Sequence, residues 1–117
     1  MTIFNSFQQA DTIAGAAAVS TGVQINNIDI VGLEMPAGWD AASITLQASR
    51  DGAAWFNVYD QFGTELTLTT AASRYIAIPP SLLAGVGYIR IRSGTSATPV
   101  NQTAARTLVW LMRNYAR

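Results

Sequence analysis

The sequence predicts an all-β protein, an antiparallel β-sandwich of the jelly-roll kind with about seven or eight short strands. Several segments alternate apolar and polar residues, as strands do when one face is buried. Turn-forming pairs such as Asp51-Gly52 and Pro79-Pro80 interrupt these segments at short intervals. The last apolar run, residues 108–112, is continuous and predicts a strand buried on both faces.

The clearest strand pair is a hairpin over residues 44–59. Ile44, Leu46 and Ala48 alternate with polar residues in the first arm. The second arm, residues 53–59, is rich in the aromatic and β-branched residues that strands favour. Asp-Gly between the arms predicts a tight turn, because both residues tolerate positive φ.

Further strands are predicted over residues 23–35, 65–69, 74–78, 87–92 and 105–113. The alternation slips at Asn26-Asn27, which predicts a bulge or bend inside the first of them. One short helical turn is predicted over residues 81–85, with Ser81 as its N-cap and Gly85 just after its end.

The length of 117 residues predicts a single domain over residues 1–117. Residues 1–20 are expected to include an edge strand or an extended N-terminal arm, and 10–20 to be irregular or a short strand. No apolar run approaches the ~20 residues of a membrane-spanning helix, and the N-terminal segment lacks the basic region of a signal peptide.

The residue types that are missing exclude several classes of function. The chain has no Cys and no His, so it cannot form a Ser-His-Asp or Cys-His catalytic arrangement or a thiolate metal site. We therefore expect no enzymatic activity, no cofactor and no metal ion. The loop residues Asp40, Asp51 and Asp60 could supply oxygen ligands to calcium, but a turn-forming role is favoured.

The balance and number of charges bear on the partners. Seven Arg and no Lys face seven acids, so the net charge is zero and neither nucleic acid nor a membrane is an expected partner. Only 12% of the residues are charged, against roughly a quarter in an average domain. A weakly charged surface resists self-association poorly, which favours a homo-oligomer or a subunit of a larger assembly.

Three segments in order carry a resemblance to a known class of protein: ITLQASRDGAAWFNVYD, SRYIAIPPSLLAGVGYIRIRSGT and RTLVWLMR. Over roughly residues 22–113 the chain resembles small structural proteins of tailed bacteriophages. The pieces SRDGAAW and YIRIR also resemble parts of galactose-binding-like, discoidin-type jelly rolls. The first resemblance implies a virion protein made in the host bacterial cytoplasm. The second implies a jelly roll whose loops bind sugars or lipids.

Three tryptophans are candidates for core or binding roles. Trp55 and Trp110 lie in predicted strands and are expected in the core or between the sheets. Trp39 lies in a predicted loop and is the candidate for a sugar-stacking site. A tryptophan that closes one end of the sandwich is the favoured alternative.

Three arginines, Arg74, Arg90 and Arg92, are predicted to share one face of the sheet. They could bind an acidic partner or a phosphate group. The favoured alternative is pairing across the sheet with the acids Asp29, Glu34 or Glu65.

The expected function is that of a non-enzymatic virion structural protein, most of all a capsid decoration or cement protein. Its expected partners are a major capsid protein or other virion proteins and further copies of itself. The alternatives are a carbohydrate-binding module for host attachment and a neck, tail-ring or fibre component. The N-terminal arm and loop 93–103 are the expected contacts, and the candidate interface residues are Phe4, Phe7, Trp39, Arg90, Arg92, Thr98, Pro99 and Val100.

Overall fold

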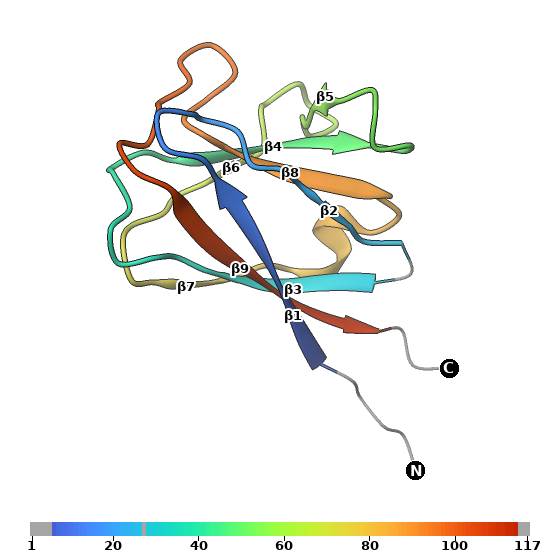
Figure 1. Ribbon diagram of the computed structural model, residues 1–117. Coiled ribbons are helices and arrows are strands. Elements are labelled where there is room, and N and C mark those ends of the chain that lie inside the picture. The colour runs from blue at the N-terminus through green and yellow to red at the C-terminus, as the bar shows by residue number, and fades with distance from the viewer. Residues whose placement is uncertain (1–5, 27, 115–117) are drawn as a thin grey trace.

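The computed structural model describes residues 6–26 and 28–114, which form a sandwich of two antiparallel sheets (Figure 1). The prediction of an all-β sandwich is confirmed. The strands of one sheet are β1 (Ser6–Ile13), β3 (Ile28–Glu34), β7 (Tyr75–Ala77) and β9 (Arg106–Asn114). The strands of the other sheet are β2 (Val23–Gln24), β4 (Ile44–Ser49), β5 (Phe56–Asn57), β6 (Thr67–Leu68) and β8 (Tyr88–Ser93).

The four-stranded sheet has the order β1-β9-β3-β7, so the last strand of the chain lies at its centre. Leu108, Trp110 and Met112 of β9 point into the sandwich and are fully buried. Val109 and Leu111 point outward and are only half-buried. The prediction that this run is buried on both faces is therefore wrong, because nothing among the described residues forms a third layer over that face.

The five-stranded sheet has the order β2-β8-β4-β5, and β6 also pairs with β4. β4 and β8 are its two long strands and pair along their whole length, from Ile44 opposite Ser93 to Ser49 opposite Tyr88. The predicted strands over residues 65–69 and 74–78 shorten to β6 and β7 and lie in different sheets.

The predicted strand over residues 23–35 is two strands in two sheets. β2 pairs with β8, whereas β3 pairs with β7 and β9. Ile25, between them, is buried and donates its backbone N–H to Gly87 O at 2.7 Å. The slip in the alternation therefore marks the place where the chain crosses from one sheet to the other. A register shift within β3, between Ile30 and Gly32, is a separate irregularity.

The hairpin over residues 44–59 is present but its turn is not tight. β4 ends at Ser49, and only Phe56–Asn57 returns as a strand, opposite Ala48 and Gln47. Local side chains hold the intervening loop open. Ser49 Oγ accepts hydrogen bonds from the N–H groups of Asp51 and Gly52, at 3.2 and 2.9 Å. Asp51 Oδ1 accepts hydrogen bonds from the N–H groups of Ala53 and Ala54, at 2.9 and 3.0 Å. Such side-chain bonds replace the ladder of a short turn.

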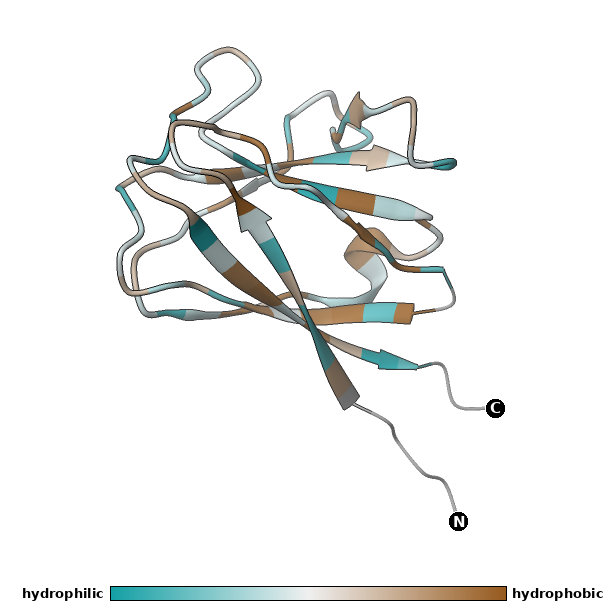
Figure 2. Ribbon diagram, viewed as in Figure 1, coloured by the Kyte–Doolittle hydropathy of each residue, from teal (hydrophilic) through white to brown (hydrophobic). Residues whose placement is uncertain are grey.

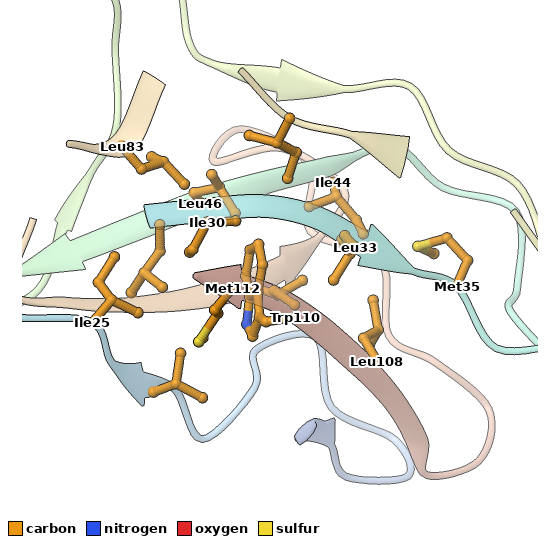
Figure 3. Close-up of a cluster of buried hydrophobic side chains, with 14 of the residues drawn as sticks. Ile25, Ile30, Leu33, Met35, Ile44, Leu46, Leu83, Leu108, Trp110 and Met112 are labelled. Atoms are coloured by element: carbon orange, nitrogen blue, oxygen red, sulfur yellow. The ribbon is translucent and has the colours of Figure 1, made fainter. Parts of the chain in front are cut away.

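Apolar residues alternate with polar ones along the long strands (Figure 2), and their inward side chains meet in one core (Figure 3). Ile44 and Leu46 of β4 lie across the interior from Trp110 and Met112 of β9. Ile30 and Leu33 of β3 lie beside these two residues in the same sheet. Leu83 closes the core from η1 (Pro80–Leu83), the predicted helical turn, which is a 3-10 turn. Its N-cap is Pro79 and not Ser81, and no side chain caps it.

The N-terminal segment divides into a strand and an irregular stretch. β1 is an edge strand paired with β9 from Ser6 to Ile13, while residues 14–18 form turns and bends. Residues 1–5, which include the candidate Phe4, lie outside the described residues. No helix in the described part of the chain is long and apolar enough to span a membrane.

Candidate interaction surfaces

The outer face of the five-stranded sheet carries a hydrogen-bonded network around Arg92. The Arg92 side chain is only 5% exposed. Its Nε donates to Thr45 Oγ1 at 3.0 Å and its Nη1 to Asn57 Oδ1 at 2.8 Å. Its Nη2 forms an ion pair with Glu65 Oε2 at 2.8 Å. Arg92 is therefore a scaffold residue, and its prediction as an interface residue is wrong.

Arg90 lies beside this network and is half-buried. Its Nε donates to Gln47 Oε1 at 2.7 Å, and its guanidinium carbon lies 4.4 Å from the centre of the Trp55 ring. Burial lowers the pKa of the Arg90 guanidinium, and the positive charge of Arg92 lowers it further. Trp55 thus stacks on the outside of the sheet, and its predicted place in the core is wrong. The ring leaves Arg90 only partly available to a partner.

Arg74, the third arginine of the predicted group, does not lie on the outer face of the five-stranded sheet. Arg74 is exposed and precedes β7 in the four-stranded sheet. The three arginines therefore do not share a face. Of the predicted ion pairs, Arg92 with Glu65 is present, whereas Asp29 pairs with Arg113 of β9, at 3.5 Å.

Trp39 closes one end of the sandwich. It is 6% exposed and its indole N–H donates to Ala42 O at 3.1 Å. A sugar cannot stack on a ring buried in this way, so the sugar-platform interpretation of Trp39 is wrong and the end-closing alternative is confirmed. Trp110 is fully buried in the core, as expected.

Three of the four strongly exposed aromatic side chains among the described residues follow β4 along the chain, and the fourth, Tyr75, lies on β7. We call Phe56, Tyr59 and Phe62 the aromatic rim; they are 69%, 50% and 84% exposed. The segment FNVYDQF holds all three. The sequence predicts a strand arm through residue 59 and does not single out the three aromatics as a surface, although three aromatics within seven residues beside a turn are a visible signal.

The tip of the aromatic rim is held in place by one carboxylate. Asp60 Oδ1 accepts the N–H groups of Phe62 and Thr64 at 2.8 and 3.0 Å, and Asp60 N donates to Thr64 O. Tyr59 bridges to Glu65 directly after this turn. The rim therefore projects from a closed, hydrogen-bonded loop.

Loop 93–103, a predicted contact, lies next to the aromatic rim. Ser96 N donates to the second oxygen of Glu65 at 3.2 Å, and Ser96 Oγ lies 3.4 Å from the Tyr59 hydroxyl. Thr98 and Pro99 at the loop tip are exposed, while Val100 is half-buried. The structure thus brings Thr98 and Pro99 near residues that sequence analysis did not single out.

Phe56, at the other side of the rim, borders a hollow of about 310 Å³. Its walls come from β4 and from the segment after η1, and they are mostly apolar. The lining residues are Ala48, Ser49, Arg50, Phe56, Gly85, Val86 and Gly87.

The loop aspartates accept hydrogen bonds from backbone N–H groups, the turn-forming role that the sequence favours. Asp60 and Asp51 accept backbone N–H groups of their own loops, and Asp40 Oδ2 accepts the N–H of Thr103. The N–H of Thr103 lowers the pKa of Asp40, and the N–H of Ala53 lowers that of Asp51. Among the described residues, no three acids gather as a metal site would need.

Phe7, the remaining candidate, is half-buried on β1 and packs against the edge of the core.

Comparisons of the chain with protein-family models, with curated proteins and with solved structures find no significant match.

Proposed function

We propose that this chain is a non-enzymatic structural protein that acts through protein–protein contacts. The observation that supports it is the aromatic rim, where three large side chains are exposed on one short segment. Exposed aromatics are the usual anchors of protein interfaces, because each buries a large area with few rotatable bonds. Loop 93–103, which contacts Tyr59 and Glu65 through Ser96, carries the exposed Thr98 and Pro99.

The scaffold behind this surface favours binding over chemistry. Glu65 is tied to Arg92 and to the backbone of loop 93–103, and Asp60 is tied to the rim loop. These acids therefore serve to hold the rim in one shape. A surface fixed before binding loses little conformational entropy when it meets its partner.

For the setting, we propose the virion of a tailed bacteriophage, where the chain would decorate the capsid. The support is the resemblance of the three segments quoted above, together with the low charged fraction of 12%. Weakly charged surfaces suit a subunit that stays packed in an assembly. The partner would then be the major capsid protein or another virion protein, with the aromatic rim as the contact.

The test is co-sedimentation of the purified chain with particles of the phage that carries its gene, prepared without the chain. We expect saturable binding by the unaltered chain and at least a tenfold loss in Tyr59→Ala/Phe62→Ala, as for anchors at an interface centre. Leu82→Ala, an exposed apolar residue on η1, is the matched control and should bind normally. Failure of the unaltered chain to bind would exclude the virion role.

Electron microscopy of the same particles separates the remaining alternatives. Extra density over the capsid surface supports decoration, whereas density at the neck, tail or fibre replaces it with one of those roles. For the carbohydrate-binding alternative, Trp39 is no longer available, so a sugar would have to stack on the rim. Glycan binding that is lost in Tyr59→Ala, without binding to particles, would favour that function.

A further inference from the structure

We infer that the free edge of β1 pairs with β1 of a second copy of this chain, around a two-fold axis. β1 is the outermost strand of the four-stranded sheet and is eight residues long. The other outer strands, β7, β2 and β5, have only three, two and two residues. In Figure 1 the N-terminal half of β1 stands clear of the five-stranded sheet.

The backbone groups that face the free edge can be assigned from two contacts of Thr12. Thr12 O accepts the N–H of Thr21, which lies on the side away from β9. The hydroxyls of Thr12 and its partner Thr107 are 3.0 Å apart, the close approach typical of a pair without backbone hydrogen bonds. Alternate residues of a strand face the same edge, so Ala10, Gln8 and Ser6 also point their N–H and C=O groups outward.

The outward edge is open over its first half. Gln8, Gln9 and Ala10 are exposed, and within the described residues no backbone group bonds to the outward side of Gln8 or Ala10. Residues 20–22 cover only the other end, where they surround Asp11. Gln9 is exposed although it lies opposite the buried Trp110, so the second sheet does not extend over this edge.

The edge also lacks the features by which proteins prevent such pairing. Free edge strands are usually blocked by Pro, Lys or other charges, or by a bulge. β1, SFQQADTI, has no Pro and no basic residue, pairs with β9 without a register shift, and carries one acid, Asp11, which is buried. The zero net charge of the chain adds no long-range repulsion between copies.

In one register the outward groups of residues 6–10 all pair with one another. An antiparallel pair centred on Gln8 joins Gln8 to Gln8 of the second copy and Ser6 to Ala10. It also sets Phe7 beside Gln9, and no charge faces a like charge. Centring the pair on Ala10 would need Thr12 O, which already accepts from Thr21. Two facing glutamine side chains can bond to each other through their amides.

The partner of the free β1 edge is a second copy of this chain, because the segment 6–10 is complementary to itself in this register. The contact is short, so it falls at the small end of interface sizes and the dimer should be reversible. This inference does not depend on the proposed function. The Tyr59→Ala/Phe62→Ala variant should still dimerise, so the two proposals can fail separately.

The first test is sedimentation velocity of the full chain from about 10 μM to about 1 mM, the range of weak association. We expect a dimer that grows with concentration. Gln8→Lys and Gln8→Glu should each weaken it at least about fivefold, because two like charges face each other. An equimolar mixture of the two should form a heterodimer at least as stable as the unaltered dimer. A chain that stays monomeric, or a mixture no stronger than either variant alone, would overturn the inference.

The second test removes a backbone donor. Ala10→Pro deletes an outward N–H without touching the bonds to β9, and should abolish the dimer. Ala77→Pro is the matched control on β7. The bonds of Ile78 N to Val31 O and of Met35 N to Arg74 O place the Ala77 N–H on the outward side of that edge. A thermal melt confirms that both variants fold. If Ala77→Pro disrupted the dimer as strongly as Ala10→Pro, the assignment to β1 would be wrong.

Discussion

Two buried charges, Asp11 in the four-stranded sheet and Arg92 in the five-stranded sheet, are held in different ways. Asp11 is 1% exposed and accepts hydrogen bonds only from neutral groups. These are Ser20 Oγ at 2.8 Å, Thr21 Oγ1 at 3.4 Å, Gly22 N at 2.9 Å and Trp110 Nε1 at 3.2 Å. Arg92 instead has an opposite charge, Glu65, besides two neutral acceptors.

The two side chains connect different elements of the fold. Asp11 joins the edge strand β1 to the core tryptophan and to the segment that leads into β2. Arg92 joins β8 to Asn57 of β5 and, through Glu65, to the loops behind the aromatic rim. One buried charge thus lies behind each proposed contact surface, β1 in one case and the rim in the other.

The largest effect is expected from removal of Asp11. Asp11→Ala leaves the donors of Ser20, Gly22 and Trp110 without their acceptor, and should lower the free energy of unfolding by about 3–4 kcal/mol. Asp11→Asn keeps one acceptor oxygen and should lose about half as much. Urea unfolding followed by tryptophan fluorescence measures both. A loss in Asp11→Ala below about 1 kcal/mol would contradict the assignment of Asp11 as a structural centre.

Breaking the Arg92–Glu65 pair should have a slightly smaller effect. Arg92→Ala leaves a mostly buried Glu65 without its cation and should cost about 3 kcal/mol. In Arg92→Met/Glu65→Leu both charges are gone, and stability should return to within about 1 kcal/mol of the unaltered chain. The double variant should still loosen loop 93–103, since Ser96 loses its acceptor. Hydrogen exchange of that loop is the measurement, with residues of β9 as the internal reference.

The contact between Arg90 and Trp55 should contribute less than either buried charge. A double-mutant cycle with Arg90→Met and Trp55→Leu should give a coupling of about 0.5–1 kcal/mol, as for cation–π pairs that are partly open to water. Chemical denaturation of the four proteins supplies the values. A coupling near zero would mean that Trp55 covers the sheet only through apolar contact.

Asp40 and Asp51 should add a small acid sensitivity, because Asp51 is exposed and Asp40 is only half-buried. Their pKa values in the folded chain lie below the ordinary value of 3.8. Their contribution to stability is therefore complete above pH 3.8 and is lost as the pH falls through the lowered folded pKa. Thermal melts between about pH 5 and about pH 2.5 should show a smaller drop for Asp40→Asn/Asp51→Asn than for the unaltered chain. An equal drop would locate the acid sensitivity elsewhere.

Local patterns in the sequence were sufficient for the two long strands of the five-stranded sheet, but not for β1, whose end at residues 10–13 falls in a stretch predicted to be irregular or a short strand. The alternation over residues 44–49 and 87–92 predicted β4 and β8, since period-two burial is visible in the residues themselves. The turn signals at Asp51-Gly52 and Pro79-Pro80 also lie where the strands stop. The same patterns did not show that residues 23–35 divide between two sheets, because a crossing and a bulge disturb the alternation alike.

The candidate surfaces depended on information that the sequence does not carry locally. Trp39 and Arg92 are predicted interface residues, yet both are buried. Trp39 belongs to the core, and Arg92 is held by Thr45, Asn57 and Glu65, which are distant in the chain. The second arm of the hairpin is a predicted strand, but only Phe56 of the three rim aromatics lies in one, and Phe56, Tyr59 and Phe62 are all exposed.

By itself, the sequence determined the fold class, the two long strands of one sheet and the absence of histidine and cysteine chemistry. These follow from composition and from periodicity within a few residues. Only the tertiary structure decided that β1 is an open edge, that Arg92 is buried in a network on the outer face of the five-stranded sheet and that the aromatic rim is exposed. Strand order and burial depend on which distant segments pair, and packing across the whole chain settles that choice.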